Sequence, residues 1–232
     1  MEKIVGVILM AGFSTRFGGP QNKTLCLLNG KPVFSYSIDA FVNSKRFDEL
    51  LIVTSAENGK DVEKYITENK INAKLVLGGK TRQESVKHAL SYIEGKGFNV
   101  AVIHDAARPL VDDVIISEVI KAANEEGAST TYLYVADTIA VKNDKEEIVE
   151  FVPRSTLASI QTPQAFKVDL LLEAHKKTKS LEATDDCSLV LALPHRVKLV
   201  KGDKKYHKVT TPEDIKYLEG LISKWKSTKL EK

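Results

Sequence analysis

Short runs of apolar, β-branched residues alternate with longer amphipathic stretches up to Val135. The apolar runs predict strands, and the amphipathic stretches predict helices. Strands are expected at residues 4–9, 50–54, 74–77, 99–104 and 130–135, and helices at 31–44, 60–69, 81–94 and 112–126. Strands that are apolar almost throughout and alternate with helices are typical of a mostly parallel sheet covered on both faces. The pattern predicts an α/β, Rossmann-like fold with its functional groups at the carboxyl ends of strands.

The alternation breaks after Val135. Residues 136–165 are polar and turn-rich, with Asn143-Asp144-Lys145 at the expected tip of a hairpin, so they predict a projecting β-arm. Helices are expected again at 168–179, 186–192 and 212–224, with a strand at 197–200. No stretch rich in Gly, Pro or Ser marks a linker, so residues 1–232 are expected to form a single domain that carries this arm.

Composition narrows the class of protein. The 232-residue chain has 34 Lys and Arg against 31 Asp and Glu, a formal net charge of +3. This excess is too small for nucleic acid or acidic lipid to be the default partner. The longest apolar run, residues 4–13, falls short of the roughly 20 residues that span a membrane, so no membrane partner is expected. The two cysteines, Cys26 and Cys187, lie far apart, which argues against a disulfide framework or a zinc site and favours a cytoplasmic location.

A loop of small residues follows the first predicted strand. Ala11 and Gly12 come directly after the strand, and Arg16 and Lys23 follow them. Backbone N–H groups in such a loop can approach a phosphate chain, and the basic side chains would add positive charge. The loop has neither the ending of a Walker A motif nor the GxGxxG pattern of a dinucleotide-binding dehydrogenase. The alternative is an ordinary turn whose basic residues face solvent.

The loop resembles the pattern small-Ala-Gly-x-x-x-Arg…Lys of nucleotidyltransferases that act on sugar phosphates or alcohol phosphates. Further segments, in the same order, narrow the resemblance over about residues 4–220 to the 2-C-methyl-D-erythritol 4-phosphate cytidylyltransferase family of the non-mevalonate isoprenoid pathway. These segments are GGKTRQESV at 78–86, HDAARP at 104–109, QTPQ at 161–164, TDD at 184–186 and KVT at 208–210. The resemblance implies a nucleotide-diphospho-sugar transferase-like fold. It also implies a Mg²⁺-dependent transfer of CMP from CTP to methylerythritol phosphate, a small polyol phosphate, with release of pyrophosphate.

The resemblance assigns catalysis to basic side chains, because the attacking phosphate oxygen is already an anion and needs no protein nucleophile. Arg16 and Lys23 would hold the triphosphate and stabilise the reacting α-phosphate, which Lys208 would reach from the other side. From composition alone, Lys208 would instead be a solvated member of the basic run at 204–208. The backbone of Ala11 and Gly12 would lie against the nucleotide.

Cytosine recognition is assigned by the same resemblance to the segment after the third predicted strand. Backbone groups at Gly79 and Lys80 would contact the base, with support from the side chains of Arg82 and Ser85. The alternative is a helix start in which Thr81 and Glu84 form a capping box, and both interpretations can hold together.

The second substrate is assigned to side chains at several strand ends and in the arm, which are Asp105, Arg108, Arg154, Thr162, Thr184 and Asp185. Asp105 would also serve Mg²⁺, directly or through water. An ion pair between Asp105 and Arg108 is the alternative for those two residues, and His104 is expected to be a packed strand-end histidine. Arg154 would enter the site of a second subunit, which implies a homodimer formed through the arm; its alternative is a solvated side chain.

The chain departs from the family's pattern at several positions. Met10 and Ser14 replace an alanine and a glycine of the loop, Asn22 and Thr24 flank Lys23 in place of proline and glutamine, and Lys80 replaces an acidic residue. A ribitol 5-phosphate cytidylyltransferase shares nearly every motif and remains an alternative. A non-catalytic nucleotide-binding regulator is a further alternative, but such a protein is expected to lose the basic side chains that this chain keeps.

Overall fold

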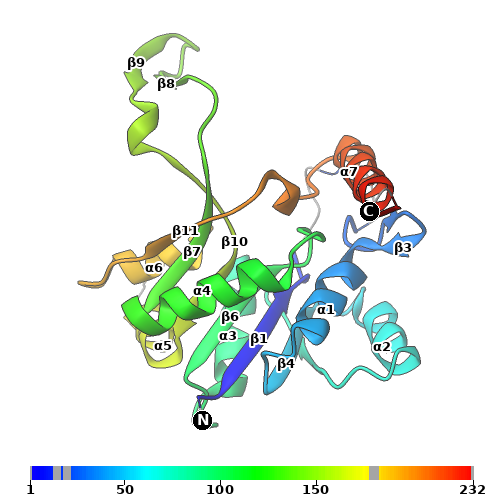
Figure 1. Cartoon of the computed structure of the whole chain (residues 1–232). Coiled ribbons are helices and arrows are strands. Elements are labelled where there is room, and N and C mark those ends of the chain that lie inside the picture. Colours follow the sequence, from blue (N-terminus) through cyan, green and yellow to red (C-terminus); the bar gives the residue numbers. More distant parts are fainter. Residues whose placement is uncertain (1, 13–16, 18–21, 178–182, 231–232) are drawn as a thin grey trace.

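The computed structural model describes the chain except residues 1, 13–16, 18–21, 178–182 and 231–232. Its centre is a seven-stranded sheet with the strand order β11-β7-β10-β6-β1-β4-β5 (Figure 1). Every neighbouring pair in this sheet is parallel except the two pairs that β10 makes with β6 and β7. The α/β, Rossmann-like fold with a mostly parallel sheet is therefore confirmed.

The strands of this sheet are β1 (Ile4–Leu9), β4 (Glu49–Thr54), β5 (Lys74–Leu77), β6 (Val100–Asp105), β7 (Ala128–Tyr134), β10 (Ala158–Lys167) and β11 (Lys198–Lys201). Two short hairpins lie outside it, β2 (Leu27–Leu28) with β3 (Lys31–Pro32), and β8 (Ile139–Lys142) with β9 (Ile148–Val152). The helices are α1 (Val33–Ser44), α2 (Gly59–Glu68), α3 (Arg82–Ile93), α4 (Asp113–Glu126), α5 (Val168–Lys177), α6 (Asp186–Leu191) and α7 (Pro212–Leu230), with 3-10 turns η1 (Arg154–Thr156) and η2 (Lys204–Tyr206).

The alternation of side chains along β1 builds a core on each face of the sheet. Val5, Val7 and Leu9 pack with α3, α5 and α6, whereas Ile8 and Met10 pack with α1, α2 and α4. Successive side chains of a strand point to opposite faces, and both faces are covered here, so the strand is apolar throughout.

Strand β10 is the main difference from the sequence prediction, because residues 158–165 were expected in the arm and lie in the central sheet. The strand is rich in polar residues, and polar residues are rare in a buried strand unless they are hydrogen-bonded. Gln164 is fully buried and donates to Thr130 Oγ1 at 3.0 Å and to Asp185 Oδ2 at 2.7 Å. Thr131 donates to the carbonyl of Pro163 at 2.7 Å. These bonds pair several polar groups of the strand inside the core, although the Oε1 atoms of Gln161 and Gln164 are buried without a partner among the described residues.

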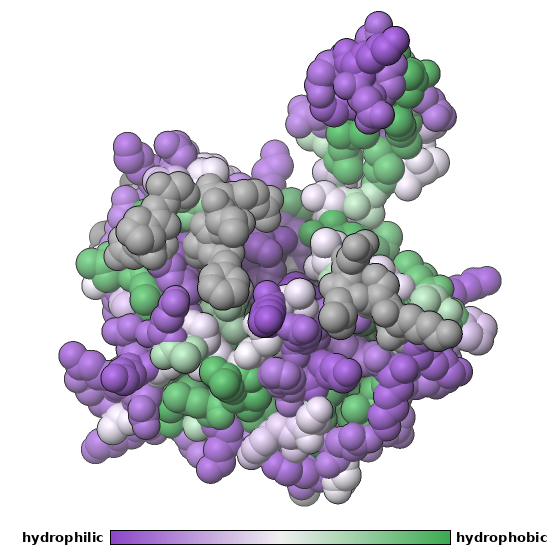
Figure 2. All heavy atoms as spheres, turned by 180° about the vertical axis from the view of Figure 1, so that it is seen from behind, coloured by the Kyte–Doolittle hydropathy of each residue, from purple (hydrophilic) through white to green (hydrophobic). Residues whose placement is uncertain are grey.

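The part that does project is a hairpin arm formed by residues 135–157, with β8 and β9 at its end. It leaves the sheet where β7 ends, at the same edge as the carboxyl ends of β1 and β6 (Figure 1). Asn143 shapes the tip, since its Oδ1 accepts from the backbone N–H groups of Lys145 and Glu147 at 3.0 Å each. Apolar side chains on the hairpin face solvent beneath a hydrophilic tip (Figure 2): Ile139, Val141, Ile148, Val149 and Phe151.

At most of the other helices and strands, the observed boundaries differ from the predicted ones by a few residues. Helix α1 begins at Val33, because Lys31 and Pro32 pair with the strand β2. Helix α5 is described to Lys177, and the rest of the helix expected at 168–179 lies outside the described residues. Helix α7 continues to Leu230, beyond the expected end at residue 224. None of the described helices combines the length and apolar character needed to cross a membrane.

Candidate active site

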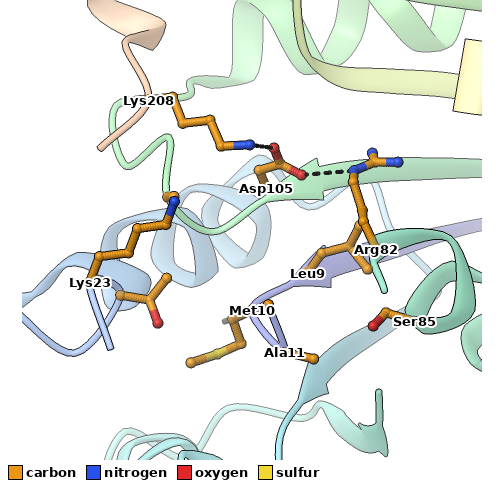
Figure 3. Close-up of a pocket in the computed structure, with 11 residues that line it drawn as sticks. Leu9, Met10, Ala11, Lys23, Arg82, Ser85, Asp105 and Lys208 are labelled. Atoms are coloured by element: carbon orange, nitrogen blue, oxygen red, sulfur yellow. Dashed lines mark hydrogen bonds and ion pairs between the residues drawn. The ribbon is translucent and has the colours of Figure 1, made fainter. Parts of the chain in front are cut away.

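A pocket of about 190 Å³ opens at the carboxyl ends of β1 and β6. Its lining combines the small-residue loop after β1 with charged side chains from distant segments (Figure 3): Leu9, Met10, Ala11, Gly12, Lys23, Thr24, Arg82, Ser85, Asp105, Ala107 and Lys208. The structure thus gathers most of the predicted catalytic and nucleotide-binding residues in one place. Arg16 lies outside the described residues. Thr24 and Ala107 are lining residues that the sequence did not single out.

The loop after β1 is held in place by contacts with two other segments. Asn58, fully buried, donates through Nδ2 to the Met10 carbonyl at 2.9 Å. On the other side, a Cβ atom at Gly78 would lie 2.3 Å from the Cβ of Ala11 and 2.8 Å from Ser85 Oγ. A side chain at position 78 would therefore push the two pocket loops apart, so the close approach requires glycine.

The start of α3 forms the capping box that the sequence left as one interpretation. Thr81 Oγ1 accepts from the Glu84 N–H at 3.0 Å, and Glu84 Oε2 accepts from the N–H groups of Lys80 and Thr81 at 2.6 and 3.2 Å. The Gly79 N–H donates to Ser85 Oγ at 3.2 Å. The N–H groups of Gly79 and Lys80 are therefore engaged within the chain, and neither residue is among the described residues that line the pocket.

Asp105, at the end of β6, is the charge centre of the pocket. One carboxylate oxygen accepts from Lys208 Nζ at 2.5 Å, and the other accepts from Arg82 Nε at 3.3 Å (Figure 3). Burial would raise the pKa of Asp105, but the charges of Lys208, Arg82 and Arg108 outweigh it and hold the pKa well below its usual range. The carboxylate is therefore ionised in the folded protein. Its ion-pair partners are Lys208 and Arg82, not the Arg108 of the alternative drawn from the sequence.

Lys23 and Lys208 reach the pocket from different segments. Lys23 follows the loop after β1, whereas Lys208 follows the turn η2 near the end of the chain. Figure 3 shows the amino group of Lys23 turned toward the side of the pocket where Asp105 and Lys208 lie. Two ammonium groups near one cavity create a positive potential that attracts polyanionic ligands.

Two buried residues beneath the pocket were not identified from the sequence. Asp186, the first residue of α6, accepts from Arg82 Nη1 at 2.6 Å and from His175 Nε2 at 3.0 Å. Burial would raise the pKa of Asp186, but Arg82 and His175 lower it. The only signal in the sequence was the TDD segment, which was assigned through its neighbours Thr184 and Asp185.

His104 is a packed histidine, as expected. Burial lowers its pKa to about 4, so the ring is neutral. The carbonyl of Arg108 can only accept a hydrogen bond, at 3.1 Å, so the ring hydrogen lies on Nε2. Nδ1 then accepts from Thr162 Oγ1 at 3.1 Å, and Thr162 Oγ1 accepts from the Asp105 N–H at 3.1 Å. Thr162 therefore supports the segment that carries Asp105.

The remaining predicted substrate residues do not line the pocket in this single chain. Arg108 donates through Nη1 to the Tyr206 carbonyl at 2.8 Å, and its pKa is lowered by burial. Asp185 caps α6 by accepting from the Cys187 N–H at 2.8 Å, and Thr184 is exposed just before it. Arg154 lies on the hairpin arm and donates to the Ala136 carbonyl at 2.7 Å.

Asp105 is the one carboxylate among the described residues that line the pocket, and a cation would share its oxygens with Lys208 and Arg82. In the part of the chain that the structure describes, no three His, Cys, Asp or Glu side chains come together as a metal site. A single ionised carboxylate fits Mg²⁺ that keeps water molecules and phosphate oxygens as its other ligands.

A small-residue loop and basic side chains at the carboxyl ends of parallel strands define an α/β protein that binds a phosphorylated ligand. The sequence model of the 2-C-methyl-D-erythritol 4-phosphate cytidylyltransferase family matches residues 4–224. The chain belongs to this family, which confirms the resemblance drawn from its motifs.

The chain is similar to individual members of this family over nearly its full length. The chain is 40% identical over 227 residues to the 2-C-methyl-D-erythritol 4-phosphate cytidylyltransferase of Caldanaerobacter subterraneus, covering 95% of this chain and 99% of that protein. It is 37% identical over 233 residues to the Clostridium tetani protein of the same name, covering 99% and 94%. The crystal structure of the Thermus thermophilus protein is 30% identical, with a TM-score of 0.74 over 96% of this chain and 100% of that one. A synthase from Anaerococcus prevotii, 24% identical, shares the fold with a TM-score of 0.83 over 96% and 99%.

Proposed function

We propose that this protein transfers CMP from CTP to 2-C-methyl-D-erythritol 4-phosphate, forming 4-diphosphocytidyl-2-C-methyl-D-erythritol and pyrophosphate. Family membership supports the reaction. The structural observation that carries the proposal is the pocket in which Lys23, Lys208, Arg82 and Asp105 meet the loop after β1. This arrangement suits a reaction between two phosphate esters, because it brings positive charge to one small cavity.

The reaction is an in-line displacement at the α-phosphorus of CTP. A phosphate oxygen of the second substrate forms a new P–O bond, and the bond to the β-phosphate breaks with its electron pair leaving on pyrophosphate. The nucleophile is already an anion, so the protein contributes position and electrostatic stabilisation rather than a base or a covalent nucleophile.

The lysines of the pocket supply that stabilisation in our proposal. Lys23 and Lys208 hold the triphosphate and the charge that develops on the α-phosphate, with Arg16 of the same loop as the third cation that the resemblance implies. Lys208 donates to Asp105 at 2.5 Å in this chain. When phosphate enters, its oxygens compete with Asp105 for the amino group, and Arg82 remains beside Asp105 to balance its charge.

In our proposal, the cytosine base of CTP binds at the start of α3. The carbonyl oxygens of Gly79 and Lys80 can accept from the exocyclic amino group of cytosine, since their N–H groups are already bonded. Arg82 and Ser85 line the same side of the pocket, and the backbone of Ala11 and Gly12 lies against the nucleotide. The narrow contact at Gly78 keeps the two loops close enough to share one ligand.

Mg²⁺ fits as a cofactor carried mainly by the phosphates of CTP. Asp105 is the residue of this chain that would hold it, directly or through water, because it is ionised and lines the pocket. When bound, the ion would neutralise the charge on the leaving pyrophosphate.

In our proposal, a second copy of the chain completes the binding site for the second substrate. Arg154 lies on the hairpin arm rather than at the pocket, and the hairpin exposes the apolar side chains of Ile148, Val149 and Phe151. Exposed apolar surface of this kind marks a contact site, and a twofold dimer would carry each Arg154 to the partner's pocket. Arg108, Thr162, Thr184 and Asp185 are then proposed to shape or contact the polyol phosphate. A cytoplasmic location is proposed because Cys26 and Cys187 are both free thiols.

The test is pyrophosphate release from CTP and Mg²⁺ with one polyol phosphate at a time. Release with 2-C-methyl-D-erythritol 4-phosphate, and little with ribitol 5-phosphate, is the expected result. Turnover of ribitol 5-phosphate alone would reassign the substrate. CTP binding without release of pyrophosphate in either mixture would reassign the protein as a nucleotide-binding regulator.

A further inference from the structure

A line of buried charges leads from α5 to the floor of the pocket. Asp186 is 1% exposed, and both of its carboxylate oxygens are engaged, one by Arg82 Nη1 at 2.6 Å and the other by His175 Nε2 at 3.0 Å. Arg82 Nε donates in turn to Asp105 at 3.3 Å (Figure 3). One guanidinium therefore bridges a carboxylate in the pocket and a carboxylate beneath it.

The guanidinium makes this bridge directional. Nε and Nη1 of Arg82 lie in one rigid plane, so fixing Nη1 at Asp186 also fixes the direction in which Nε donates. Burial lowers the pKa of Arg82, but Asp186 and Asp105 raise it more, so the group keeps its charge. Its Nη2 is buried and has no hydrogen-bond partner among the described residues. The contact with Asp186, at 2.6 Å, is shorter than the contact with Asp105, at 3.3 Å, and restrains the rotation of the guanidinium more strongly.

His175 restrains Asp186 from the opposite side. It lies in the last turn of α5 with its side chain 3% exposed. An ionised carboxylate can only accept hydrogen bonds, so Nε2 of His175 carries the hydrogen. With both oxygens bonded, Asp186 keeps one orientation, and a buried carboxylate that lost either partner would be costly.

We propose that Asp186 and His175 are positioning residues for the transfer reaction, and that they hold Arg82 so that it orients the Asp105 carboxylate beside Lys208. This inference rests on the proposed function. If Asp186 loses its charge, Arg82 is left with Asp105 as its ion-pair partner and with the weaker field of Asp185. The Asp105 carboxylate then rotates, and Lys208, which it holds at 2.5 Å, moves with it. A misplacement of about 1 Å at a reacting phosphate can lower the rate about a hundredfold, so we expect a loss of about ten- to hundredfold.

The first experiment follows the Arg82 Nε proton by NMR, independently of any reaction. The signal is assigned by its loss in Arg82→Lys, and its exchange with water is measured in Asp186→Asn, His175→Phe and His175→Gln. We expect exchange to accelerate about tenfold or more in Asp186→Asn and His175→Phe. His175→Gln places an amide donor near the position of Nε2 and should keep exchange slow. Exchange that stays slow in all three variants overturns the proposal.

The second experiment measures kcat and KM in the same variants. We expect kcat to fall about ten- to hundredfold in Asp186→Asn and His175→Phe and to recover within about threefold in His175→Gln. The matched control is Asp39→Asn, which replaces a half-buried carboxylate that accepts from Tyr65 at 2.7 Å beside the core on the other face of the sheet. It should lower the melting temperature and leave kcat unchanged.

The two experiments separate the two hypotheses. Faster exchange with an unchanged kcat in Asp186→Asn and His175→Phe would overturn the positioning role. If exchange is faster in these variants but the wild-type protein releases no pyrophosphate, the proposed function is overturned. The role of Asp186 in this reaction is then overturned with it. If Asp186→Asn fails to fold, the pair His175→Phe and His175→Gln still decides, because it leaves both members of the Arg82–Asp186 ion pair in place.

Discussion

The charges beneath the pocket are paired within the chain, whereas the hairpin arm leaves its side chains exposed. Asp105 and Asp186 are buried, and each accepts from two cationic or imidazole groups. On the arm, Phe151 is 62% exposed, and Arg154 donates to the backbone carbonyl of Ala136 in its own chain. Buried charges need partners inside the fold, whereas exposed apolar surface marks a site where another molecule can bind. This difference supports the proposal that one chain assembles the nucleotide end of the site and that a second chain completes the substrate end.

The largest effect is expected from Lys208→Ala. Removing a cation that stabilises developing charge lowers kcat about 100- to 1,000-fold, as measured by pyrophosphate release. Lys205→Ala is the matched control, because Lys205 pairs with Asp112 at 2.5 Å, the same distance as Lys208 with Asp105, but outside the pocket. Its rate should stay within about threefold of wild type. Equal losses in the two variants would remove Lys208 from the mechanism.

A smaller effect is expected from Arg154→Ala. A charge-assisted hydrogen bond to the substrate phosphate is worth about 2 kcal/mol, so kcat/KM for the polyol phosphate should fall about thirtyfold. CTP affinity, measured by calorimetry, should not change, because the nucleotide end contains no residue of the arm. Lys145→Ala, at the tip of the same hairpin, serves as the control. Weakened CTP binding in Arg154→Ala would contradict the division of the site into a nucleotide end and a substrate end.

Phe151→Asp tests the exposed arm itself. A charge on this apolar surface should weaken the proposed dimer, and sedimentation should show more monomer than in the wild-type protein at equal concentration. Activity should fall severalfold and recover at high protein concentration, because association restores complete sites. A wild-type protein that sediments as a monomer, or a variant whose dimer is unaffected, would contradict the role of the arm.

The last prediction concerns stability at low pH rather than the rate of the reaction. Burial lowers the pKa of His104 to about 4 from its ordinary value of 6.5. The unfolded chain therefore takes up a proton below about pH 6.5 that the folded chain does not bind until about pH 4, and the free energy of unfolding falls across this window by at most about 1.4 kcal/mol per pH unit. Denaturant titrations should show a shallower fall for His104→Gln. Exposed His195→Gln should follow the wild-type slope, and a His104→Gln slope equal to wild type would contradict the prediction.

The sequence predicted the fold where local pattern and burial agree. Strand β1 matches its predicted bounds because its apolar run is buried, and the edge strand β5 also matches although most of its residues are exposed. Strand β10 was missed because its buried Gln164 and Thr162 read as a polar, extended segment. Their burial depends on hydrogen bonds to β7, β6 and α6, which are distant in sequence and leave no periodic signal.

The pocket shows the same limit. Lys23, Asp105 and Lys208 were named through the motifs that carry them, and the structure brings them to one cavity. The buried pair of Asp186 and His175 was not named, because two adjacent aspartates begin α6 and only the three-dimensional turn decides which one points inward. Asp185 caps the helix, and Asp186 meets Arg82.

The most direct measurement of the division between the two ends mixes two impaired variants. Lys208→Ala and Arg154→Ala proteins are combined, allowed to exchange subunits, and assayed for pyrophosphate release with CTP and 2-C-methyl-D-erythritol 4-phosphate. If each site takes Lys208 from one chain and Arg154 from its partner, half of the sites in a mixed dimer are intact, and activity should return to about one quarter of the wild-type rate. A mixture no more active than its two components would show that each chain builds its site alone and would contradict the account.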